Sequence, residues 1–153
     1  HGGGAEARKL LESAVRHQQA AVKAAPTPAY RQTLLLHYAV LADLLLRQRD
    51  HAAAAAALAG LLEVVPADWP KRPQVAAHLA RCAALAREDK KLGAAERQRR
   101  AEDYADRAMQ QLQEAVRHGF KDRDYLNKTE DFDALRERPD FKELLGKLGG
   151  GGL

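Results

Sequence analysis

The chain has 153 residues, 46% hydrophobic but only 5% aromatic, and 25 basic against 21 acidic side chains give a formal net charge of +4. That length suits one compact domain or a short repeat array, and the mild, interleaved charge does not indicate a nucleic-acid or membrane partner. No apolar run approaches the roughly 20 residues that span a bilayer, no signal peptide is visible and Cys82 is the single cysteine, so we expect a cytoplasmic protein without an internal disulfide.

The pattern predicts an all-α fold. Alanine supplies much of the hydrophobic content, and it is the best helix former, whereas no stretch alternates polar and apolar residues for long enough to suggest a strand. Pro26 and Pro66 end two helices, Asp50 is a credible N-cap, Gly119 suits a left-handed C-terminal position and Pro139 suits a first helical turn. The expected helices are 5–24, 28–48, 51–64, 72–87 and 94–118, followed by a helical tail at 122–126, 131–136 and 139–148.

Glycine runs mark both ends of the chain. They predict a flexible N-terminus at 1–4 and a flexible C-terminus at 149–153, on either side of a helical repeat domain at 5–148. The missing initiator methionine indicates an excised fragment. His1-Gly2-Gly3-Gly4 also matches the oxyanion-hole motif of some esterases, but the required Gly-x-Ser-x-Gly element is missing, because the only serine is Ser13 in a predicted helix. Hydrolase activity is therefore the least favoured hypothesis.

A repeat of the tetratricopeptide kind fits residues 38–66. The pattern places large and small side chains at fixed positions on two helices and closes with a proline. The matching residues are Tyr38, Leu41, Ala42 and Leu45 on the first helix and Ala54, Leu58, Leu61 and Pro66 on the second. Small residues at positions 42 and 54 allow the two helices to approach closely.

Two further units are degenerate. Ala14, Ala21 and Pro26 fit the second half of an earlier unit, where Gln18 is polar at a position that is usually apolar. A third unit has Ala76, Leu79, Ala80 and Ala83 on its first helix and Ala108, Leu112, Ala115 and Val116 on its second. The spacing is 40 residues from Ala14 to Ala54 and 54 from Ala54 to Ala108, against about 34 for a standard unit. We expect a right-handed α-α superhelix of about five long antiparallel helices with a short C-terminal helical cap, and an ordinary antiparallel bundle remains the alternative.

A broader resemblance covers nearly the whole chain. The segments that carry it are 16–21, 29–32, 44–54, 79–82, 104–109 and 131–141. Together they resemble the C-terminal tetratricopeptide region of large bacterial serine/threonine protein kinases. The resemblance implies a kinase domain upstream in the parent protein and an apolar cap made by Phe132, Leu135 and Phe141 at the end of the last repeat.

Catalytic and metal-binding patterns are weak. The kinase glycine-rich loop, His-Arg-Asp and Asp-Phe-Gly are absent, and residues 131–133 read Asp-Phe-Asp. His78 and Cys82 share a helical face, but two further zinc ligands are not evident, so Cys82 is interpreted as a small packed hydrophobe. The basic residues of segment 90–100 are interleaved with acidic ones, which favours a solvated face over an anion site. We expect no catalytic residue, no metal and no cofactor.

The concave groove of such a repeat is lined by the first helix of each unit. In this register it comprises Ala39, Asp43 and Arg47 from one unit and Gln74, His78 and Arg81 from the next. Asp43 replaces the Asn of the clamp that binds C-terminal carboxylates in some tetratricopeptide domains, which disfavours a chaperone-tail receptor. The sequence therefore predicts a non-catalytic protein–protein interaction scaffold, monomeric or weakly self-associating, that recruits a protein or peptide for an attached kinase. The alternative is a structural or self-association domain without a peptide ligand.

Overall fold

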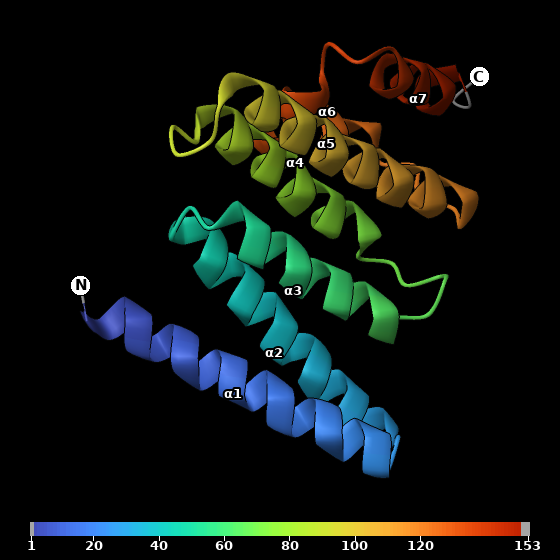
Figure 1. Cartoon of the computed structure of the whole chain (residues 1–153). Helices are drawn as coiled ribbons and strands as arrows, with labels where there is room; N and C mark the ends of the chain where they lie inside the picture. Colours follow the sequence, from blue (N-terminus) through green and yellow to red (C-terminus); the bar gives the residue numbers. More distant parts are fainter. Residues whose placement is uncertain (1, 151–153) are drawn as a thin grey trace. The chain divides into compact units, whose positions relative to one another are not determined.

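The computed structural model describes residues 2–150 and consists of helices over that range (Figure 1). The elements are α1 (Gly2–Ala24), α2 (Pro28–Arg47), α3 (His51–Val64), α4 (Arg72–Glu88), α5 (Ala94–Arg117), α6 (Arg123–Lys128), the 3₁₀ helix η1 (Glu130–Leu135) and α7 (Pro139–Gly150). The all-α prediction is confirmed, and the five long helices lie close to their predicted bounds. The chain divides after Pro66 into two compact units, which are described separately below.

The helix ends differ most from expectation at the glycine runs. Helix α1 begins at Gly2, so three glycines assigned to a flexible N-terminus form its first turn, and α7 continues to Gly150. His1 and residues 151–153, where the predicted flexible ends also fall, lie outside the described residues. Pro139 begins α7 as predicted, since a proline in the first helical turn gives up no intrahelical hydrogen bond.

In the first unit, α2 packs against both α1 and α3. Ala42 on α2 and Ala54 on α3 are completely buried, which confirms the prediction that small side chains lie where helices meet. Gly60 has the same role on α3, because a Cβ atom built there would lie only 2.6 Å from the ring of Tyr38. Close packing of these helices thus depends on residues with little or no side chain.

The connection between α2 and α3 satisfies its own backbone groups. Asp50 N–H donates to the Leu45 carbonyl and Arg49 N–H to the Leu46 carbonyl, which is the Schellman pattern. Arg49 has a φ of 62° in the position that glycine usually occupies. The Asp50 carboxylate then accepts a hydrogen bond from Ala53 N–H at 3.1 Å, so the predicted N-cap is confirmed.

Helix α1 is less deeply packed than the sequence suggested. Helical spacing predicts that Leu10 and Val15 share the packed face of this helix, but only Val15 is buried and Leu10 is 70% exposed. The prediction for Leu10 is therefore wrong. Gln18, the polar departure from the repeat, donates to the Tyr30 carbonyl at 3.0 Å and so links the end of α1 to the start of α2.

In the second unit, α4 and α5 form a hairpin, and η1 packs against α4. Ala76, Ala80, Ala83, Ala105 and Ala108 are completely buried, as expected for helices in close contact.

Helix α5 ends as the sequence predicts. Phe120 N–H donates to the Ala115 carbonyl, Gly119 N–H donates to the Val116 carbonyl and Gly119 has a φ of 100°. This is a second Schellman motif, here with the expected glycine in the left-handed position.

The tail adds an aromatic cluster to the second unit. Phe132 and Phe141 stack with ring centroids 6.0 Å apart, and Tyr125 meets Phe132 edge to face at 5.7 Å. Phe132, Leu135 and Phe141, the three residues expected to form the apolar cap, are completely buried; that they close a last repeat stays a prediction. Segment 131–136 was expected to be helical and is found as η1, with 3₁₀ geometry in a single short stretch.

No helix among residues 2–150 is both long and apolar enough to cross a bilayer.

Candidate functional site

The accessible side of α2 carries two exposed large apolar side chains. Leu36 is 61% exposed and Val40 46% exposed, and they lie one helical turn apart. Ala39 lies beside them and is exposed. Asp43 and Arg47 continue the same side of the helix and form an ion pair with N–O distance 2.5 Å. We call these five residues the α2 face.

The α2 face brings together the three predicted groove residues of the first unit. Ala39, Asp43 and Arg47 all remain accessible, as the groove prediction requires. Sequence reasoning missed Leu36 and Val40, which contribute most of the apolar surface. A signal was available, because these two residues lie on the opposite side of the helix from the buried stripe of Leu34, Tyr38 and Leu41.

The other three predicted groove residues lie on α4, in the second unit. Gln74 is exposed, whereas His78 and Arg81 are half-buried. Helix α4 is otherwise buried on most sides, so these residues form its accessible stripe. The six residues therefore form two sets of three, one in each unit, and each set is described on its own helix.

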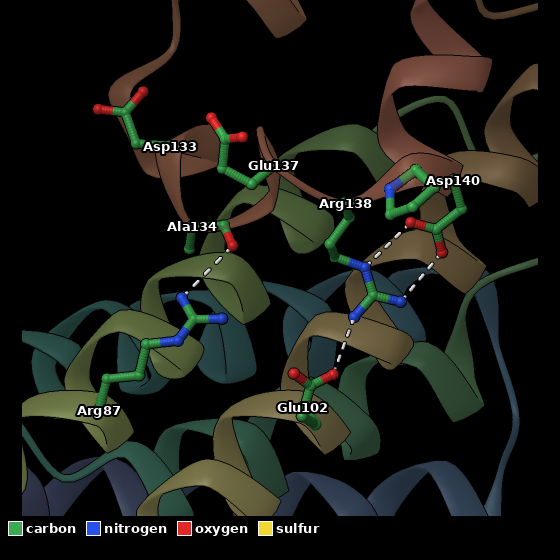
Figure 2. Close-up of a pocket in the computed structure, with 8 residues that line it drawn as sticks. Arg87, Glu102, Asp133, Ala134, Glu137, Arg138 and Asp140 are labelled. Atoms are coloured by element: carbon green, nitrogen blue, oxygen red, sulfur yellow. Dashed lines mark hydrogen bonds and ion pairs between the residues drawn. The ribbon is translucent and has the colours of Figure 1, made fainter.

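A pocket of about 710 Å³ lies in the second unit, where the tail meets α4 and α5 (Figure 2). Its lining residues are Arg87, Glu102, Asp133, Ala134, Glu137, Arg138, Pro139 and Asp140. The volume falls within the range of small-molecule sites, but none of the lining side chains is a histidine, serine, cysteine, tyrosine or lysine. The usual nucleophiles and bases of catalysis other than carboxylates are therefore absent from it.

Arg138 occupies the centre of the pocket wall and is engaged by carboxylates. Its guanidinium donates to Asp140 at 3.0 Å, and Glu102 lies 3.6 Å away (Figure 2). It also donates to Asp106 at 2.8 Å. The hydrogen bond to Arg138 is the main cause that holds the pKa of Asp140 below its ordinary value, and the same bond contributes most to raising the pKa of Arg138. Asp106 and Glu102 belong to α5, so Arg138 fastens the tail to that helix.

The remaining pocket charges are also partnered. Arg87 donates to the Ala134 carbonyl at 3.4 Å (Figure 2). Asp133 pairs with Arg136, and Glu137 lies 3.6 Å from Lys142. The contact from Arg87 joins η1 to α4, whereas the ion pairs of Asp133 and Glu137 lie within the tail. The arrangement is that of a structural joint, and sequence reasoning did not anticipate it because its members come from four separate segments.

The sequence pair His78 and Cys82 does not converge on a metal site. Cys82 is completely buried and burial raises the pKa of its thiol to about 12, so the thiolate that zinc requires is disfavoured. Within residues 2–150, no group of three or more His, Cys, Asp and Glu side chains is placed to hold a metal ion. Cys82 packs as the small hydrophobe that the sequence suggested.

The basic residues around the α4–α5 loop are largely paired. Glu96 accepts hydrogen bonds from Arg99 and Arg100, which hold the pKa of Glu96 below its ordinary value. Arg97 donates to the Leu92 carbonyl at 3.2 Å. This pairing agrees with the interpretation of the segment as a solvated face.

Comparison with known proteins found no matching family model, no similar curated protein and no similar solved structure.

Proposed function

We propose that this chain is a non-catalytic protein–protein interaction scaffold of the tetratricopeptide kind, with the α2 face as its docking surface. The observation that carries the proposal is the exposure of Leu36 and Val40 on a helix whose other side is buried. Apolar side chains one turn apart, bordered by the Asp43–Arg47 ion pair, suit an amphipathic partner segment, because the apolar pair supplies affinity and the charges fix its register.

The repeat interpretation is supported by the alanine positions. Ala42 and Ala54 are buried within the first unit, and Ala76, Ala80 and Ala108 within the second, which is what helical hairpins of a repeat array require. The right-handed superhelix and the joint groove formed by both sets of three residues remain predictions that follow from this register.

The proposed setting is the C-terminal region of a serine/threonine protein kinase. This part rests on the sequence resemblance alone, and it assigns phosphoryl transfer to another part of the parent protein. In that setting the scaffold recruits a substrate or regulator to the kinase. The alternative is a structural or self-association domain without a peptide ligand. The observation that supports it is the light packing of α1, in which Val15 is the one buried side chain within residues 3–24.

Crosslinking of the chain to its partners tests the docking surface. We compare the wild-type chain with the charge reversals Asp43→Lys and Arg47→Glu, and with Leu36→Asp, which places a charge at the centre of the α2 face. The control is Lys23→Glu, a reversal at an exposed position on α1. We expect the three α2 variants to lose crosslinked proteins that the control retains, whereas identical partner sets for all four variants would refute the assignment of the α2 face.

A further inference from the structure

Helix α1 is held to the rest of the first unit mainly by polar contacts. Within residues 3–24, Val15 is the one buried apolar side chain. The polar attachments include the 2.8 Å ion pair from Arg8 to Asp50 and the 2.5 Å hydrogen bond from Gln19 to the Tyr38 hydroxyl. Gln18 also donates to the Tyr30 carbonyl, and Gln48 donates to the Gly4 carbonyl, each at 3.0 Å. Such polar contacts exchange readily with water and add little net stability, so α1 belongs to the low-stability end of the unit.

The connection from α1 to α2 is short and exposed. It comprises residues 25–27, and Pro28 follows in the first turn of α2. Thr27 is extended, with φ −83° and ψ 154°. Pro26 and Pro28 prevent α1 and α2 from fusing into one helix, and each proline biases the residue before it towards extended backbone. A change of backbone conformation at residues 25–27 would therefore move α1 away from its own α2 while both helices stay intact.

We propose that α1 exchanges between two copies of this chain, so that in the resulting dimer α1 of each copy packs on α2 of the other. When α1 leaves its own α2, α1 of the second copy takes its place, because it can make the same contacts. Arg8 then pairs with Asp50 of the second copy, and Gln19 donates to Tyr38 of the second copy. Because the contacts are conserved, the exchange costs only the change in the hinge and the entropy of association.

This exchange does not depend on the proposed docking surface. It uses the side of α2 that carries Tyr38 and is covered by α1 (Figure 1), whereas Leu36 and Val40 lie on the accessible side. The α2 face therefore stays free in the exchanged dimer, and failure of one proposal leaves the other standing.

Paired charge reversals test the exchange. An Arg8→Glu chain places two acidic residues together within one copy, and an Asp50→Arg chain places two basic residues together. In an exchanged heterodimer of these variants, both pairs regain opposite charges. We expect each variant alone to sediment as a monomer and the equimolar mixture to give a heterodimer, enriched at least tenfold over either homodimer by native mass spectrometry.

The control mixture combines Arg16→Glu with Glu63→Arg, two exposed residues outside the α1 attachments named above, and it should give no enrichment. A complementary mixture that contains only monomers overturns the proposal. Because Asp50 also caps α3, the Asp50→Arg variant loses that cap, and a second measurement avoids that position.

That second measurement uses energy transfer between otherwise wild-type chains. A Lys9→Cys chain carries a donor on α1, and an Ala56→Cys chain carries an acceptor on α3. Both positions are exposed, whereas Cys82 is completely buried and stays unlabelled under native conditions. Exchange predicts transfer that develops after mixing at high concentration, and the absence of transfer at every concentration overturns the proposal.

Discussion

Replacing Gly60 by alanine should destabilise the first unit, although alanine is the better helix former. In an unobstructed helix interior the change from glycine to alanine gains about 1 kcal/mol. At position 60 the new Cβ would lie 2.6–2.8 Å from three atoms of the Tyr38 side chain, two ring carbons and the hydroxyl oxygen. Tyr38 is 6% exposed and its hydroxyl is bonded to Gln19, so the ring has little room to move, and overpacking of this kind costs about 1–3 kcal/mol.

The net expectation for Gly60→Ala is a loss of about 1–2 kcal/mol, measured by urea denaturation followed by circular dichroism. Gly146→Ala is the matched control, because a Cβ there meets nothing within 4 Å in helix α7, and it should gain about 0.5–1 kcal/mol. In a Tyr38→Leu background the Gly60→Ala change should become neutral or favourable. A Gly60→Ala chain at least as stable as wild type would refute the reasoning.

Four further predictions follow from single residues. Arg49→Gly should stabilise the chain by about 1 kcal/mol in urea denaturation, because it relieves a left-handed non-glycine residue with φ 62°, and a loss of stability would contradict this. Arg138→Gln should lower the free energy of unfolding by about 1–2 kcal/mol and speed hydrogen exchange in the tail. The control Arg99→Gln removes an ion pair of a 71% exposed side chain and should change stability by less than about 0.5 kcal/mol. Equal effects of the two substitutions would contradict a special role for Arg138. Arg138 lowers the pKa of Asp140 from its ordinary 3.8, so the unfolded chain binds that proton more readily and the stabilisation present at neutral pH should be lost as the pH falls below about 4. In the Asp140→Asn variant the free energy of unfolding should therefore decrease less steeply with falling pH. An unchanged pH dependence in acid would contradict the role of this pair. The Cys82 thiol, with its pKa raised to about 12, should react with a thiol reagent at pH 8 only after denaturation, and rapid reaction in the native chain would contradict its burial.

The helices could be predicted from the sequence because their signals are local. Asp50 caps α3, Pro66 follows its end and Gly119 takes the left-handed position after α5, and each signal acts within one helical turn. The burial of Ala42 and Ala54 could also be predicted, since the repeat pattern fixes where neighbouring helices touch.

The remaining features depend on contacts between distant segments. Arg138 meets Asp106 across 32 positions in the chain, and no periodic pattern predicts such a contact. Leu10 looked like part of a packed stripe, but its neighbours cover only the adjacent side of α1. Leu36 and Val40 differ from these cases, because helical spacing alone places them opposite the stripe of Leu34, Tyr38 and Leu41, and their exposure could have been predicted.

The central claim is that the α2 face receives a partner, and site-specific photocrosslinking from position 40 tests it most directly. A photoreactive amino acid replaces Val40 in one chain and the exposed Arg16 of α1 in another. The account predicts a discrete crosslinked protein from position 40 that position 16 does not yield. Equal crosslinking from both positions, or none from position 40 at any chain concentration, would contradict it.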